Sequence, residues 1–210
     1  MMNQKRSPVK SVATLSFFFR ISYGAFLATF CGFAIGQPIY EQISVCHGFG
    51  CSISSTISLS DREWKSVVGW LEKVAPDAKT ERDNIRQAIG WMEVIVGRHG
   101  PGRQDKGLDL QYANTKIGQM DCIDESTNTK TYLRLFEKAS LLHWHQVIDN
   151  IQRRGLIDAH WASQIEEIST GERYVVDSWF HDNGMLPNIQ KTKEWSEVHL
   201  FSAQWDNSKN

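Results

Sequence analysis

The feature that most constrains this chain is an uncharged apolar run, ISYGAFLATFCGFAI, at positions 21–35. Basic residues precede it, and no acidic residue occurs before position 41. A basic segment followed by an apolar one is typical of an export signal. The run has no polar face, so a buried helix of the folded domain is the less favoured interpretation. We therefore predict that residues 1–36 are a signal peptide or a membrane anchor and that residues 37–210 form a single folded domain.

The sequence leaves two fates open for this leader. Ala34 and Gly36 are small residues that precede Gln37, which permits cleavage after Gly36. If the run extends to Ile39, it is long enough to span a bilayer as a helix of about 20 residues. In both cases the basic residues stay inside and the remainder lies outside the cytoplasm. We predict an exported protein, either periplasmic or anchored in the inner membrane through this segment.

Composition excludes several classes for residues 37–210. The whole chain is 41% apolar and 22% charged, which is ordinary for a globular protein and excludes a disordered or low-complexity chain. The length suits one domain with a core and is too short for two comfortable ones. The formal net charge is −1, and acidic residues outnumber basic ones beyond the leader. We therefore expect no nucleic-acid partner, because such a partner requires a broad basic surface.

The cysteines single out one thiol. Cys31 lies in the leader, whereas Cys46 and Cys51 frame the short segment Cys-His-Gly-Phe-Gly-Cys. Its two glycines allow a tight loop, and an oxidising compartment favours a disulfide between the two cysteines. Zinc is the alternative for this pair, but only His47 is available nearby as a further ligand. A disulfide leaves Cys122 unpaired, and an odd thiol in an exported protein warrants a catalytic hypothesis.

Hydrophobic periodicity predicts an α+β domain of helices packed on an antiparallel sheet. Ser60 and Glu63 form a capping box that opens a helix. A long polar loop over residues 97–118 precedes Cys122, and the tail after Pro187 is expected to pack onto the domain. The predicted elements are a strand over 52–60, helices over 61–75, 80–97 and 122–142, and strands over 143–151, 159–168 and 173–180.

Cys122, His160 and Asp177 form the constellation that we expect to carry chemistry. A helix start and a nearby histidine both stabilise a thiolate, and Cys122 lies at a predicted helix start. Asp177 follows three largely apolar residues at the end of a strand, where a charge is costly without a partner. A histidine on the neighbouring strand is a natural partner. The carboxylate would then fix the tautomer and orientation of His160.

The segments around these residues resemble the transglutaminase-like branch of the papain-type thiol enzymes. The resemblance lies in Gly-Gln-Met-Asp-Cys at 118–122, His-Trp-Ala at 160–162 and Tyr-Val-Val-Asp-Ser-Trp at 174–179, in that order. It covers about residues 115–185 and implies a cysteine that heads a helix packed on an antiparallel sheet. It also implies Cys122 as the nucleophile, His160 as general base and acid, and Asp177 as the residue that orients the histidine.

The turn between the last two predicted strands decides whether His160 and Asp177 meet. A two-residue turn at Thr170 and Gly171 would place His160 opposite His181, whereas a wider turn would place it opposite Asp177. The two registers differ by an even number of residues. Both therefore keep His160 and Asp177 on one face of the sheet.

Acyl transfer also needs hydrogen-bond donors for the oxyanion. The backbone N–H of Cys122 is available, and Gln119 is the best side-chain candidate, with Gln111 and Asn114 behind it in the preceding loop. We predict a thiol-dependent amide hydrolase or acyl transferase that works through an acyl-enzyme on Cys122, without a cofactor. The expected substrate is a peptide, a cell-wall peptide or a protein side chain.

Two alternatives come from other functional classes. The domain could be a non-catalytic envelope protein that keeps the fold for binding. His143 and His145 lie two residues apart in a predicted strand, so both face the same way and, with His160 and Asp177, could hold a metal ion. A strand at the rim of the sheet accounts for the two histidines more simply, and we prefer that interpretation.

Overall fold

The computed structural model describes residues 38, 40, 42–100, 102–108, 118–154 and 159–197. These residues all belong to one unit of the chain, Gln37–Asn210. The predicted leader at residues 1–36 lies outside the described residues, as do Gln111 and Asn114. Within the described part, no helix combines the length and the apolar character that crossing a membrane requires.

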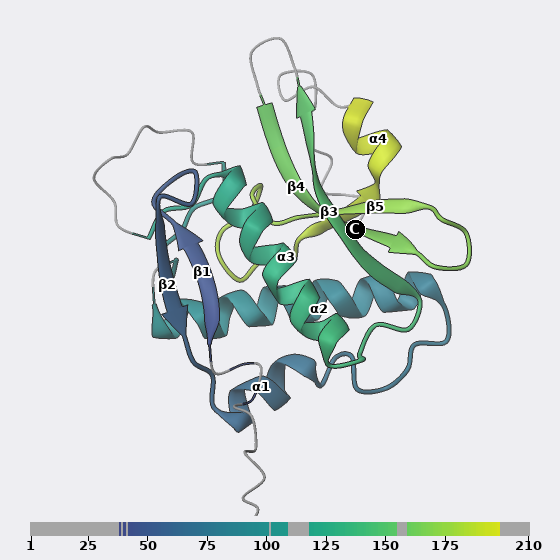
Figure 1. Cartoon of the computed structure of the whole chain (residues 1–210), viewed down its shortest axis with the longest axis horizontal. Coiled ribbons are helices and arrows are strands. Elements are labelled where there is room, and N and C mark those ends of the chain that lie inside the picture. The colour runs from purple at the N-terminus through teal and green to yellow at the C-terminus, as the bar shows by residue number, and fades with distance from the viewer. Residues whose placement is uncertain are drawn as a thin grey trace, which may run out of the picture. The chain divides into compact units, whose positions relative to one another are not determined.

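The described residues form an α+β structure, as the periodicity predicts. Strands β3 to β6 make a four-stranded antiparallel sheet in chain order, and β1 and β2 make a separate antiparallel hairpin. Helix α3 lies between the hairpin and the sheet, and α2 crosses it (Figure 1). The elements are β1 (Ile43–His47), β2 (Ile53–Ile57), α1 (Asp61–Val68), α2 (Ala78–His99), α3 (Cys122–Lys138), β3 (His145–Arg154), β4 (Ala159–Glu167), β5 (Arg173–Asp177), β6 (Asn188–Lys191) and α4 (Thr192–Glu197).

Helix starts follow the capping signals in the sequence. Ser60 caps α1 through the predicted box with Glu63. Asp121 caps α3, so this helix begins at Cys122 as predicted. It ends at Lys138 rather than at 142, because Ser140 adopts a left-handed conformation with φ of 57°. The backbone N–H of Leu141 then bonds back to the carbonyl of Phe136, which closes the helix end.

Helix α1 is shorter than predicted. It ends at Val68 instead of continuing to residue 75, and Gly69 forms its C-cap. A turn after Val68 returns Leu71 to the core, where it is 2% exposed, and leaves Val74 on the surface, 54% exposed. Val74 is therefore not part of the buried stripe that helical spacing assigns to it.

Two strands have no counterpart in the periodicity. In β1 the last three residues, from Val45 to His47, are all buried, so the strand lacks the alternation that reveals a half-exposed strand. Strand β6 is only four residues long and lies in the segment predicted as an irregular tail. Up to Glu197, where the described residues end, the tail packs onto the domain as expected, since Trp195 is fully buried.

The β4–β5 ladder adopts a register between the two considered from the sequence. Ser163 pairs with Val176, and the backbone N–H of Glu167 bonds to the carbonyl of Glu172 at 2.8 Å, which leaves a four-residue turn. Continued by one residue, this register puts Asp177 level with Ala162, two residues from His160. The offset is even, so His160 and Asp177 share a face as diagonal neighbours.

The core fixes α3 against the sheet. Burial of one large apolar side chain contributes about 1.5–3 kcal/mol, and the interface between α3 and the sheet contains several. This packing sets where the first residue of α3 lies relative to the head of β4. Fully buried core residues of α2, α3, β4 and β5 include Ile85, Ile89, Leu133, Phe136, Ile165 and Val176.

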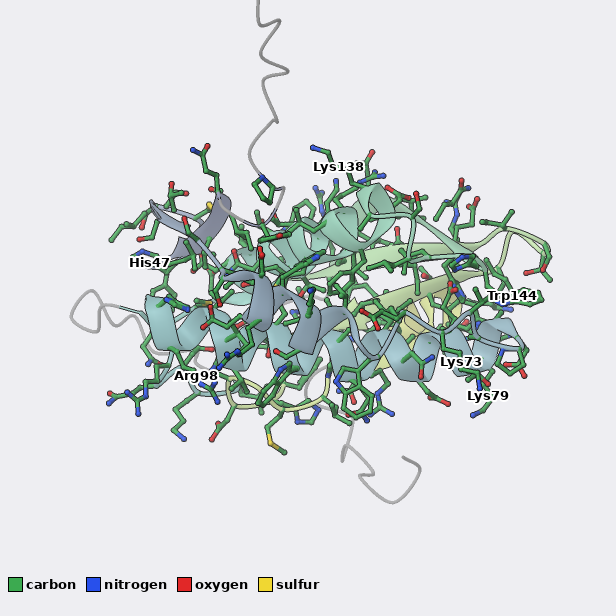
Figure 2. All side chains as sticks on the ribbon, turned by 90° about the horizontal axis from the view of Figure 1, so that it is seen from below. His47, Lys73, Lys79, Arg98, Lys138 and Trp144 are labelled. Atoms are coloured by element: carbon green, nitrogen blue, oxygen red, sulfur yellow. A yellow bond between two sulfur atoms is a disulfide. The ribbon has the colours of Figure 1, made fainter. Side chains whose placement is uncertain are left out.

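Charged side chains surround this core. Figure 2 shows Lys73, Lys79, Arg98 and Lys138 at the periphery, spread over different edges of the unit rather than gathered on one. Lys79 pairs with Asp83 at 3.0 Å on the surface of α2. Surface pairs of this kind contribute little to stability, about 0–1 kcal/mol.

Candidate active site

The start of α3 holds Cys122 in a defined position. The carboxylate of Asp121 accepts the backbone N–H groups of Ile123 at 3.0 Å and Asp124 at 2.9 Å. In return, the carboxylate of Asp124 accepts the backbone N–H of Asp121 at 3.2 Å. Cys122 is thus the first helical residue, enclosed by a reciprocal capping box. It is the one free cysteine among the described residues and is partly exposed.

The thiol of Cys122 lies against the backbone on both sides of His160. Its Sγ is 3.9 Å from the carbonyl oxygen of Ala159, and the backbone N–H of Trp161 is directed at the sulfur. Burial, with a smaller contribution from the charges of Asp121 and Asp177, raises the pKa of the Cys122 thiol to about 11, although the N–H of Trp161 acts in the opposite direction. The resting sulfur is therefore a protonated thiol at neutral pH.

His160 and Asp177 form a fully buried pair. Nε2 of His160 is 2.7 Å from Oδ2 of Asp177, and neither side chain has appreciable solvent exposure. With a proton on Nε2 donated to the carboxylate, Nδ1 carries the lone pair of the ring. Nδ1 of His160 has no hydrogen-bond partner among the described residues. The buried ring therefore keeps one basic nitrogen unsatisfied, beside the segment that touches Cys122.

Aromatic side chains enclose this pair. The ring of His160 lies 4.7 Å from that of Trp179, 5.1 Å from that of Phe180 and 5.5 Å from that of Trp195, measured between ring centroids. Nε1 of Trp195 also donates to Oδ2 of Asp177 at 2.8 Å. No pattern in the sequence predicts this second donor, because Trp195 lies in the segment beyond the last predicted strand.

Gln119, the proposed oxyanion donor, makes a different contact. Its Nε2 donates to the carbonyl oxygen of Gln104 at 2.9 Å, and its own backbone carbonyl accepts the N–H of Gly48 at 3.1 Å. The side chain is 5% exposed. Gln119 thus joins two loops in this structure, and the hydrogen that bonds to Gln104 is not offered to an oxyanion.

Buried carboxyl groups lie behind the start of α3, and the sequence did not single out Glu93 or Asp105 among them. Glu93 of α2 and Glu125 of α3 are almost fully buried, as is Asp105. Burial raises the pKa of Glu93 to about 7 and that of Glu125 well above its usual range, and the mutual charges of the group add to both shifts. A side-chain hydrogen bond joins Glu125 to Asp105, which requires a proton between the two carboxyls.

His143 and His145 do not form a ligand pair. Strand β3 begins at His145, so His143 lies before it and is exposed. The ring of His145 is buried, with Nδ1 2.9 Å from the carboxylate of Glu81 and Nε2 3.1 Å from Arg82. Both nitrogens of His145 are therefore engaged. The expectation of a shared face was wrong, because His143 is exposed outside the strand whereas His145 is buried within it. Within the described ranges, no group of three or more His, Cys, Asp or Glu residues is arranged to hold a metal ion.

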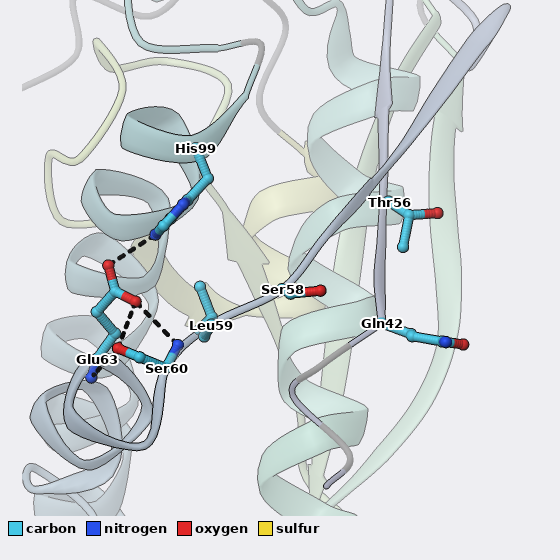
Figure 3. A pocket seen from close by; sticks show the side chains of 7 residues that line it. All are labelled: Gln42, Thr56, Ser58, Leu59, Ser60, Glu63 and His99. Atoms are coloured by element: carbon cyan, nitrogen blue, oxygen red, sulfur yellow. Dashed lines mark hydrogen bonds and ion pairs between the residues drawn. The ribbon is translucent and has the colours of Figure 1, made fainter. Parts of the chain in front are cut away.

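A cavity of about 580 Å³ lies beside the first helix, away from Cys122 (Figure 3). Glu63 is its central polar group, 2.6 Å from Nε2 of His99, and accepts the hydroxyl of Ser60 at 2.7 Å. Hydrogen bonds from Ser60 and His99 lower the pKa of Glu63 to about 2. Ser60 and His99 both bond to the carboxylate rather than to each other, so the group lacks the serine–histidine contact of a serine nucleophile.

Cys46 and Cys51 form a disulfide, as predicted. The bond links β1 to the loop before β2 and is compatible with an oxidising, exported compartment. His47, the only local candidate for a zinc ligand, has Nε2 3.0 Å from the hydroxyl of Ser55.

Similarity to known proteins does not indicate a function for this chain. Comparisons with models of protein families, with curated proteins and with solved structures found no match to this chain. We therefore infer the function from the geometry around Cys122, His160 and Asp177.

Proposed function

We propose that this protein is a thiol-dependent amide hydrolase or acyl transferase with Cys122 as nucleophile, His160 as general base and acid, and Asp177 as the orienting residue. The observation that carries the proposal is the 2.7 Å bond between Nε2 of His160 and Asp177, formed beside the backbone that the Cys122 thiol touches. A helix headed by a cysteine and packed on an antiparallel sheet also supports a transglutaminase-like core.

The reaction divides into two acyl transfers. Nδ1 of His160 takes the proton of the Cys122 thiol as the sulfur attacks the carbonyl carbon of an amide. The tetrahedral intermediate then collapses, the C–N bond breaks, and the imidazolium gives its proton to the leaving amine. Water or an amine next attacks the thioester, loses its proton to Nδ1 and releases the acyl group, and the proton returns to sulfur.

Asp177 makes this proton transfer possible. Its carboxylate accepts the N–H at Nε2, so it selects the tautomer in which Nδ1 can take a proton, and it stabilises the imidazolium once formed. The same low-polarity surroundings that raise the pKa of the thiol strengthen this attraction. The sulfur is thus a protonated thiol at rest, and we infer that it becomes a nucleophile only as its proton moves to His160.

The proposed substrate and location follow from the same chemistry. An exported thiol enzyme without a cofactor would act on a peptide, a cell-wall peptide or a protein side chain. The Cys46–Cys51 disulfide supports a location outside the cytoplasm, either in the periplasm or on the outer side of the inner membrane.

The test is site-specific labelling of Cys122. An iodoacetamide-type probe with a peptide-like amide should label the Cys122 peptide, as read by mass spectrometry of digests. His160→Ala should lower the labelling rate by the ~10²–10⁴ expected from loss of a general base. His143→Ala, which removes an exposed histidine, is the matched control and should leave the labelling rate of Cys122 unchanged. Equal labelling rates in His160→Ala and His143→Ala would rule the proposal out.

A non-catalytic binding protein is the second candidate. It is favoured by the complete burial of His160 under three aromatic rings, which leaves little room for a reacting group. In that case the Cys122 thiol should be inert at neutral pH, and Cys122→Ala should lower the free energy of unfolding like any partly buried core change. Rapid labelling of a folded Cys122 excludes this candidate.

A further inference from the structure

The disulfide loop between β1 and β2 has an unusual backbone. Four consecutive residues adopt positive φ, namely 81° at Gly48, 68° at Phe49, 65° at Gly50 and 56° at Cys51. Glycine tolerates this region, but Phe49 and Cys51 carry side chains that disfavour it. The loop therefore needs an external constraint, and the Cys46–Cys51 disulfide closes it at its two ends.

The loop aims its backbone donors at the first turn of α3. The N–H of Phe49 donates to Oδ2 of Asp124 at 2.8 Å, and the N–H of Cys51 donates to Oδ1 of the same residue at 2.6 Å. The N–H of Gly50 donates to Oδ2 of Asp121 at 2.9 Å. Successive N–H groups in such a turn form a nest for anions, and here the anions are the two carboxylates that flank Cys122.

A second contact joins β1 to α3, one helical turn beyond Asp124. The side-chain amide of Asn128 accepts the backbone N–H of Cys46 at 2.7 Å and donates to the carbonyl of Cys46 at 2.9 Å. The disulfide therefore lies between two anchor points on α3.

Asp124 is the residue through which the loop acts on Cys122. It accepts the N–H groups of Phe49, Cys51 and Asp121, so it ties the loop to the capping box that fixes the first residue of α3. Without the loop donors, the carboxylates of Asp121 and Asp124 would lose three hydrogen bonds. The first turn of α3 would then hold the Cys122 sulfur less firmly against the backbone N–H of Trp161, the contact that lowers the pKa of the thiol.

We propose that Asp124 is a positioning residue for the Cys122 thiol and that the Cys46–Cys51 disulfide holds it in place, so that reduction loosens the start of α3 and slows the reaction of Cys122. The step is a thiol–disulfide exchange. A dithiol reductant gives two electrons and two protons to the disulfide, yields two cysteine thiols, and becomes a disulfide itself. The effect on reactivity rests on the function proposed above.

The test compares the oxidised full chain with the same chain after treatment with dithiothreitol. Alkylation of the Cys122 peptide is followed by mass spectrometry as a function of pH, and amide hydrogen exchange is measured in parallel. Reduction should slow alkylation at pH 7 by about tenfold, the change that one pKa unit of the thiol would produce, and move the pH profile upward. It should also speed exchange at Ile123 and Asp124 while the sheet amides of Ser163 and Val176 stay protected.

Variants separate the proposed route from general loosening. Asp124→Asn should reduce the difference in the alkylation rate of Cys122 between the oxidised and the reduced chain. Asp83→Asn, on the exposed surface of α2, should leave this difference in alkylation rate unchanged. The double variant Cys46→Ala/Cys51→Ala should show, without any reductant, the alkylation rate and hydrogen exchange of the reduced chain.

The outcomes that overturn the inference are distinct from failure of the proposed function. Unchanged exchange at Ile123 and Asp124 after reduction, or equal or faster alkylation, would refute the positioning role. If Cys122 resists alkylation in every form, the proposed function fails, yet the exchange data still decide whether the loop holds the start of α3.

Discussion

Asp177 is the residue on which most of the buried polar contacts of the site converge. It is 2% exposed and accepts hydrogen bonds from both His160 and Trp195 on the same oxygen, Oδ2. A buried charge is stable only when such donors compensate it. The strand pattern predicted the first donor from sequence, because a carboxylate at the end of an apolar strand requires a partner. The second donor comes from α4, and no local signal connects that helix to Asp177.

Trp195→Phe removes the N–H donor while keeping an aromatic ring in the core. We expect the free energy of unfolding to fall by about 1–2 kcal/mol, because a hydrogen bond to a charged acceptor is lost. Urea denaturation measures this change. Trp70→Phe, at a residue 48% exposed, is the control and should change stability by less than about 0.5 kcal/mol. Equal losses of unfolding free energy in both variants would show that the smaller ring, rather than the missing N–H donor, lowers stability.

Helices α2 and α3 meet through carboxyl groups as well as through apolar side chains. Glu93 accepts the backbone N–H of Gly184 at 3.1 Å, and burial together with the charge of Asp105 keeps its pKa near 7. Helical spacing identified the apolar face of α2 correctly, including Ile85 and Met92, which are fully buried. It could not identify Glu93, because a periodicity argument assigns a charged residue to the exposed face.

This arrangement gives stability a definite pH dependence. The pKa of Glu93 is raised from 4.5 to about 7 in the folded state, so its contribution is complete below pH 4.5 and is lost as pH rises toward 7. Glu93→Gln should therefore gain stability relative to the unmodified chain between pH 5 and pH 8, by up to about 3 kcal/mol. Urea unfolding at several pH values measures this difference. Exposed Glu72→Gln is the control, and a difference that does not change with pH would contradict the assignment.

The molecule as a whole is assembled from contacts that are distant in sequence. Helix caps, apolar helix faces and the order of strands β3, β4 and β5 could be predicted, because each depends on neighbouring residues. Strand β1, the β4–β5 register and the bond from Trp195 to Asp177 could not, since they depend on tertiary packing. The same division holds for the site. The side-chain types and their order pointed to Cys122, His160 and Asp177. The Cys46–Cys51 disulfide was also predicted, but the contacts of its loop with Asp121 and Asp124 at the start of α3 were not.

Residues 1–36 should be dispensable for folding of the rest. The unit Gln37–Asn210 has an apolar core of its own, so a chain that begins at Gln37 should be soluble and unfold cooperatively. Circular dichroism and urea unfolding test this expectation. An insoluble or unfolded product, alongside a full-length chain that is folded in detergent, would make the leader part of the fold.

The four-residue turn between β4 and β5 has a consequence for how this protein can change over generations. The turn is exposed, and its left-handed Gly171 is its one demanding position, so substitutions elsewhere in it cost little. The pairing of the two strands is more demanding, because a slip of the β4–β5 ladder by one residue would turn the carboxylate of Asp177 to the opposite face of the sheet, away from His160. Lineages that keep the proposed chemistry should therefore be free to rewrite this turn but not to shift the ladder by one residue.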